Sequence, residues 1–210
     1  MAVRKVVTRR SRNVRGYMPS LKMGRAVAWE SQNELKLLRL LELSGSVVEY
    51  DVQPSVEIIE VAGIKQIYIP DVQVRYDDGQ IVTLEVKPVN RLMNSKVAAR
   101  MEAFKNQCEE NNRKFYIITD IQLEAEPRTK NCEELMYHRR QISKRNRYDL
   151  EKQVNAANPK TIEDLIDLIG KQLSDVALGS GIVGINIDFP IERRTEIRLC
   201  GGHHYAHLHP

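Results

Sequence analysis

The 210-residue sequence has little cysteine and no long apolar run. Its three cysteines (Cys108, Cys132 and Cys200) are too few and too widely spaced to indicate a disulfide framework or a zinc ribbon. No apolar stretch approaches the roughly 20 residues that a membrane-spanning helix requires, and no apolar segment follows the charged N-terminus as in a secretory signal. We therefore expect a cytoplasmic protein without membrane contact. Its length and its 42% hydrophobic residues are sufficient for a buried core.

Acidic residues are absent from the first 25 positions, which carry eight lysines and arginines. A basic segment of this kind is typical of a polyanion-binding arm, because each phosphate contact releases condensed counterions. We therefore predict a basic arm over 1–25, whose DNA-contacting residues are Arg9, Arg10, Arg12, Arg15, Lys22 and Arg25. A second basic stretch covers 138–147. There, nucleic-acid contact and a solubilising surface both remain open.

Hydrophobic periodicity predicts an α/β domain followed by a smaller domain that is mainly helical. We expect helices over 31–43 and 95–110, and strands over 47–52, 56–61, 64–69, 71–76, 80–87 and 114–118. Composition changes near 126–127, which places the α/β domain at 26–126 and the second domain at 127–210. The second domain combines a basic helical stretch, an amphipathic helix from Ile162 to Leu173, and β-like runs at 182–189 and 195–199. This order favours a helix-turn-helix or winged-helix fold.

The most informative chemistry lies in the hairpin predicted over 71–87. A loop of Asp77, Asp78 and Gly79 centres the hairpin on Asp78, because glycine adopts the left-handed conformation that such a loop requires. Asp71 and Glu85 are equidistant from this centre and should lie side by side. Two carboxylates at adjacent strand ends form a hard oxygen site suited to Mg²⁺. The alternative is an ordinary hairpin, in which facing carboxylates repel unless a cation lies between them.

Lys87 follows Glu85 by two residues and therefore lies on the same face of the strand. An ammonium group there can stabilise developing charge or position an attacking water. A third acidic group is expected from the helix over 31–43, where Glu30 and Glu34 share a face. Ser31 and Glu34 also fit a capping box, so the pattern leaves catalytic and capping roles equally open for Glu34.

Several segments together resemble the TnsA family, the endonuclease subunit of heteromeric cut-and-paste DNA transposases. The resemblance covers about residues 16–120, with a weaker terminal pattern at 187–197. It rests on Gly24-Arg25, Trp29-Glu30-Ser31 with Glu34, Tyr50 with Gln53-Pro54, Tyr68-Ile69-Pro70-Asp71, Asp78-Gly79 and Leu84-Glu85-Val86-Lys87-Pro88. It implies a restriction-endonuclease-like core, a mixed sheet flanked by helices with the PD-(D/E)xK signature.

The resemblance also implies a function, a cofactor and partners. The family's catalytic positions correspond to Glu34, Asp71, Glu85 and Lys87. The ligands of Mg²⁺ would be Asp71, Glu85, Glu34 and the Val86 carbonyl, and Mn²⁺ is expected to substitute for Mg²⁺. The expected activity is cleavage of double-stranded DNA next to the 5′ ends of a transposon, near the bacterial nucleoid. Expected partners are a DDE-type transposase subunit (TnsB-like) and an AAA+ ATPase regulator (TnsC-like). A free-standing restriction- or resolvase-type nuclease and a non-catalytic DNA-bridging subunit are the alternatives.

Overall fold

The computed structural model describes residues 14–199, which divide into two compact units. The first comprises residues 14–38 and 47–124, and the second comprises residues 39–46 and 125–199. The boundary falls within helix α1 (Gln32–Leu43), whose first turns belong to the first unit and whose last turns belong to the second. None of the helices described over these residues has the length and apolar character needed to cross a membrane.

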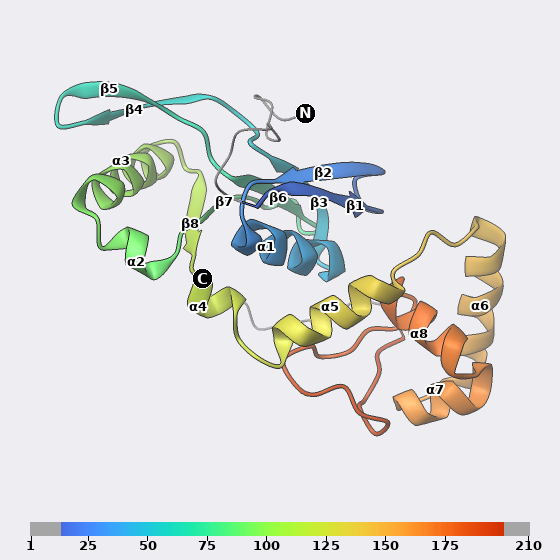
Figure 1. Ribbon diagram of the computed structural model, residues 1–210. Helices are drawn as coiled ribbons and strands as arrows, with labels where there is room; N and C mark the ends of the chain where they lie inside the picture. Colours follow the sequence, from blue (N-terminus) through green and yellow to red (C-terminus); the bar gives the residue numbers. More distant parts are fainter. Residues whose placement is uncertain (1–13, 200–210) are drawn as a thin grey trace. The chain divides into compact units, whose positions relative to one another are not determined.

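A four-stranded mixed sheet forms the centre of the first unit (Figure 1). Its strand order is β3 (Val47–Val52), β6 (Val72–Tyr76), β7 (Ile81–Val86) and β8 (Lys114–Ile118). β6 is antiparallel to both of its neighbours, whereas β8 runs parallel to β7. Since parallel strands need a crossover connection, the chain between them forms α2 (Val89–Leu92) and α3 (Ser95–Glu110). The α/β class and a central mixed sheet with helices are confirmed.

Helix α3 begins where the sequence predicts it, because the Asn94 side chain accepts hydrogen bonds from the N–H groups of Lys96 and Val97. Its buried face packs in an aromatic cluster with β8 and with the hairpin formed by β4 (Glu57–Val61) and β5 (Ile64–Tyr68). Phe104 is fully buried there and stacks on Tyr68, with ring centroids 4.3 Å apart. This packing fixes the end of β5, three residues before Asp71.

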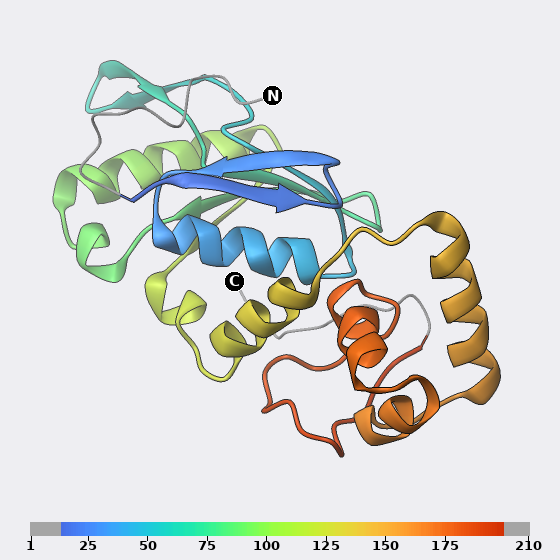
Figure 2. The same ribbon diagram turned by 45° about the vertical axis from the view of Figure 1, so that its right-hand side comes forward.

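A second hairpin, β1 (Gly16–Ser20) and β2 (Arg25–Trp29), includes residues 16–25 of the predicted basic arm. Figures 1 and 2 show it beside the first turns of α1. Although the segment is rich in basic residues, alternate side chains of both strands are buried: Met18 and Ser20 on β1, and Val27 and Trp29 on β2. The arm residues Arg9, Arg10 and Arg12 lie outside the described residues.

The second unit contains four further helices, which confirms its helical character. They are α5 (Arg128–His138), α6 (Lys144–Ala157), α7 (Ile162–Ile169) and α8 (Lys171–Gly179), while α4 (Asp120–Leu123) closes the first unit. The helix predicted from Ile162 to Leu173 is interrupted at Gly170, whose φ of +79° ends α7. The prediction of one continuous helix is therefore wrong.

The predicted β-like runs at 182–189 and 195–199 are also wrong as strands. Over the described part of the chain they contribute only isolated bridges, Thr161 with Glu196 and Gly184 with Arg198. Ile182, Val183, Ile185 and Ile187 of the first run are buried, whereas Phe189 is exposed. The Asn131 side chain donates hydrogen bonds to the carbonyls of Ile187 (2.9 Å) and Phe189 (2.8 Å). A side-chain amide thus takes the place of a partner strand. The winged-helix prediction is not confirmed.

Candidate active site

The register of the β6–β7 hairpin places Asp71 opposite Glu85, as predicted. β6 and β7 pair Val72 with Leu84 and Val74 with Val82, so the next position outward aligns Asp71 with Glu85. The register is fixed at the other end by Gly79, which has φ of +82° in the three-residue loop. Pairing with both β6 and β8 encloses β7, and five of its six residues are buried.

Lys87 connects the two carboxylates. Its Nζ lies 2.5 Å from Oε1 of Glu85 and 3.6 Å from Oδ2 of Asp71, and it also donates to the Val86 carbonyl at 3.2 Å. Oδ2 of Asp71 accepts a 2.8 Å hydrogen bond from the Val86 N–H. The cation that lets two carboxylates face each other on adjacent strands is therefore Lys87 itself. Repulsion between the carboxylates does not by itself require a metal ion.

Glu85 is the most buried member of this cluster, with its side chain only 3% exposed. Its Oε2 has no hydrogen-bond partner among the described residues. Burial raises the pKa of Glu85 and the charge of Asp71 raises it further, while Lys87 opposes both effects. For Lys87, burial lowers the pKa, but the charges of Asp71 and Glu85 outweigh it and the net shift is upward. Lys87 is therefore a protonated donor in this site.

Glu34 lies at the start of α1, where its side chain and N–H form the capping contacts that the sequence allows. Its N–H donates to Ser31 Oγ at 3.2 Å, while its Oε1 accepts from Ser31 Oγ at 3.0 Å and its Oε2 accepts from the Glu30 N–H at 2.8 Å. This is a capping arrangement. Burial and the charge of Asp71 raise the pKa of Glu34, and Glu34 lines the same cavity as Asp71 and Glu85.

A cavity of about 320 Å³ brings these side chains together. Its walls include all four candidate residues, Glu34, Asp71, Glu85 and Lys87. Sequence reasoning missed two other wall residues with polar side chains, Tyr68 and Arg100. Tyr68 could have been found, because it directly precedes the Ile-Pro-Asp segment, whereas no local pattern singles out Arg100.

The oxygen-only donors fit a hard cation such as Mg²⁺ in type, and the orphaned Oε2 of Glu85 offers a buried acceptor. Within residues 14–199, however, no three His, Cys, Asp or Glu side chains already stand in a metal-ligating arrangement. The ammonium of Lys87 takes up part of the carboxylate cluster instead.

The described residues of the predicted arm are engaged within the first unit. Arg25 pairs with Asp51 at 2.6 Å, Lys22 donates to the Val47 carbonyl at 2.6 Å, and Arg15 lies 3.9 Å from Glu30. The structure therefore places these three cations against the protein's own acceptors. Contact with DNA through them would need these bonds to be shared or exchanged.

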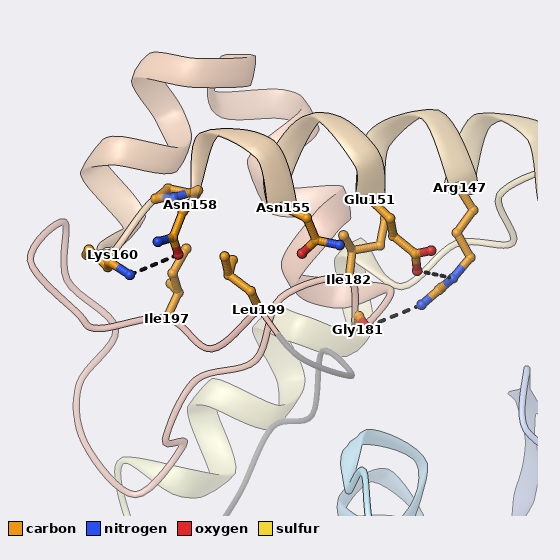
Figure 3. A pocket seen from close by; sticks show the side chains of 10 residues that line it. Arg147, Glu151, Asn155, Asn158, Lys160, Gly181, Ile182, Ile197 and Leu199 are labelled. Atoms are coloured by element: carbon orange, nitrogen blue, oxygen red, sulfur yellow. Dashed lines mark hydrogen bonds and ion pairs between the residues drawn. The ribbon is translucent and has the colours of Figure 1, made fainter.

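A larger cavity, of about 730 Å³, lies in the second unit between α6 and the segment 181–199 (Figure 3). Its arginine, Arg147, is already engaged by Glu151 and by the carbonyls of Ser180 and Gly181. Its lysine, Lys160, donates to the Asn158 side chain at 2.8 Å. The smaller cavity, with its acidic cluster, is therefore the better candidate for chemistry.

A family model described as "TnsA-like endonuclease N terminal" matches residues 44–120. A search of curated proteins finds no match to this chain. The matched segment contains Asp71, Glu85 and Lys87, and Glu34 precedes it. This part of the chain is thus similar to a TnsA-like endonuclease domain, which supports a TnsA-like family and a nuclease role.

Proposed function

We propose that this chain is a metal-dependent DNA endonuclease, the subunit of a heteromeric transposase that cleaves next to the 5′ ends of the transposon. The observation that carries the proposal is the convergence of Asp71, Glu85 and Lys87 at adjacent strand ends, in one cavity and inside the segment similar to TnsA-like endonucleases. A DDE-type transposase subunit and an AAA+ ATPase regulator are the partners that this similarity favours.

The charge of the cavity supports a divalent cation as cofactor. Four carboxylates line it (Glu30, Glu34, Asp71 and Glu85), against two cations (Lys87 and Arg100). A phosphodiester carries a negative charge, so this excess must be neutralised before the DNA backbone can approach. Asp71, Glu85, Glu34 and the Val86 carbonyl would hold Mg²⁺ or Mn²⁺. The bound ion would polarise the phosphoryl oxygen and lower the pKa of a coordinated water.

The remaining groups have roles that follow from their geometry. Lys87 is protonated, so we assign it to orienting the attacking water and to stabilising charge that develops on the phosphate, not to deprotonating the water. The Val86 N–H holds Asp71 in place through its hydrogen bond to Oδ2. The capping bonds of Glu34 fix its carboxylate in the wall of the cavity.

Cleavage of supercoiled and linear DNA by the purified protein, with and without a transposase and an ATPase subunit, tests this proposal. We expect cleavage in Mg²⁺ or Mn²⁺, none in EDTA, and a loss of about 10³-fold or more in Asp71→Asn and Lys87→Met. An Asp71→Asn protein that cleaves like the wild type would contradict the assignment. Activity that needs no partner would instead favour a free-standing nuclease, and DNA binding indifferent to Mg²⁺ would favour a bridging subunit.

A further inference from the structure

Arg100, on helix α3, lines the same cavity as the acidic cluster. We propose that Arg100 forms a phosphate-binding subsite, whose guanidinium holds a backbone phosphate of double-stranded DNA beside the carboxylates. The inference rests on the proposed endonuclease function. It assigns the substrate-side contact that neither the sequence motif nor the carboxylate cluster supplies.

The guanidinium of Arg100 is already fixed in place. Its Nη2 donates to the Ile67 carbonyl at 2.9 Å, and its Cζ lies 5.9 Å from the centre of the Tyr68 ring. Tyr68 is in turn held by stacking on Phe104. An arginine held in this way loses little side-chain entropy when it binds an anion.

The charge of Arg100 is not neutralised within the described structure. Lys87, the other cation of the cavity, lies within 4 Å of both Glu85 and Asp71. No carboxylate among residues 14–199 lies within ion-pairing distance of Arg100, although four carboxylates line the same cavity, and its one described acceptor is a neutral carbonyl. A guanidinium with free donors at the wall of such a cavity matches the geometry and charge of a phosphate group.

Arg113 offers a direct comparison, because it has the same local architecture without the cavity. It lies 5.7 Å from the centre of the Phe104 ring, and its Nη1 and Nη2 donate to Glu57 of β4 at 2.8 and 3.3 Å. Arg100 and Arg113 thus both tie the β4–β5 hairpin to the α3–β8 region, and each has a buried Nε without a partner. They differ in that Glu57 neutralises Arg113, which does not line the cavity.

Comparing variants of the two arginines therefore distinguishes phosphate binding from the structural role of linking the β4–β5 hairpin to the α3–β8 region. The variants are Arg100→Met and Arg113→Met of the full chain, each assayed by fluorescence anisotropy on a short labelled duplex, with Ca²⁺ in place of Mg²⁺. An arbitrary duplex is a valid probe because phosphate contacts carry no sequence information. Thermal unfolding of each variant is measured alongside.

We expect Arg100→Met to weaken DNA binding about 5–10-fold and to reduce the slope of log K against log [salt] by about 0.9, the value for one phosphate contact. Arg113→Met should lower the melting temperature and leave both the affinity and the slope unchanged. Arg100→Gln, which loses the charge but keeps an N–H donor for the Ile67 carbonyl, should reproduce the change in slope with a smaller effect on stability. In cleavage assays, Arg100→Gln should raise KM more than it lowers kcat.

Two results would overturn the inference. One is a salt slope that Arg100→Met and Arg100→Gln leave unchanged, and the other is a pair of Met variants that differ from the wild type only in melting temperature. Failure of the proposed function looks different: the wild type would bind DNA with the Arg100-dependent slope, but would not cleave it in Mg²⁺ with partners present.

Discussion

Replacing Glu34 with glutamine separates its capping role from its proposed catalytic role. In the wild type, the two carboxylate oxygens accept from Ser31 Oγ and from the Glu30 N–H. Glutamine offers one carbonyl oxygen, so one of these charge-assisted bonds is lost, at a cost of about 1.5–3 kcal/mol. Relief of the buried charge, whose cost is evident in the raised pKa of Glu34, offsets part of this loss. We expect the melting temperature to fall by about 2–4 °C.

The expected effect on activity is much larger. Glu34→Gln removes a negative charge beside Asp71, so metal-dependent cleavage should fall by about 10²–10³-fold. Ser31→Ala is the matched control, because it removes a cap worth about 1 kcal/mol but leaves the Glu34 charge and its bond to the Glu30 N–H. Cleavage by Ser31→Ala should stay within a few-fold of the wild type.

Single-turnover cleavage in Mg²⁺ and thermal unfolding, followed by fluorescence of the only tryptophan, measure the two effects separately. Trp29 is a suitable reporter because it is buried in the first unit, close in sequence to the start of α1. If Ser31→Ala and Glu34→Gln lose stability and activity in equal measure, Glu34 acts only through the start of the helix. Its place among the catalytic residues would then have to be withdrawn.

Three further predictions concern stability. The pKa of Glu34 is raised above its ordinary 4.5 in the folded protein. The stability of the wild type relative to Glu34→Gln should therefore be greatest below about pH 4.5 and should fall as the pH rises through the raised pKa. Urea titrations in EDTA at several pH values measure this difference. Gly179→Ala would place a Cβ 2.7–2.8 Å from three backbone atoms of residues 135–139. We expect this clash to lower the free energy of unfolding, measured by chemical denaturation, by about 3 kcal/mol. The control Gln172→Ala, on the exposed face of α8, should change it by less than about 0.5 kcal/mol. The side chain of Glu42 is fully buried and accepts hydrogen bonds from Arg139 at 2.9 and 2.7 Å. Glu42→Ala should therefore lower the free energy of unfolding by about 3–5 kcal/mol in the same measurement. The double variant with Arg139→Met should lose less than the sum of the two single variants.

The part of the site that could be predicted from sequence depends on local rules. Strand alternation and a glycine in a three-residue loop determine the hairpin register, and with it the meeting of Asp71 and Glu85. An asparagine before an apolar 3.6-residue repeat determines the start of α3. In each case the signal lies within about 15 residues of the structure that it determines.

The features that sequence reasoning missed depend on contacts between distant segments. The β1–β2 hairpin is concealed by its basic residues, and its alternation becomes informative only once Trp29 is known to be buried. The buried run from Ile182 to Ile187 reads as a strand, but its carbonyls are satisfied partly by an asparagine more than 50 residues earlier. Arg100 enters the cavity because α3 packs on β5, 33 residues away, and no motif records that contact.

The position of Lys87 changes the argument for a metal ion. From the sequence, facing carboxylates at 71 and 85 predict an external cation, because like charges on adjacent strands repel. In the structure, the chain supplies that cation itself, through the 2.5 Å contact between Lys87 and Glu85. The argument for a divalent ion therefore rests on the whole cavity and not on the pair of Asp71 and Glu85. Four carboxylates line the cavity, two more than its cations, Lys87 and Arg100. That excess disfavours a phosphodiester, and it is the approach of DNA that requires the additional positive charge.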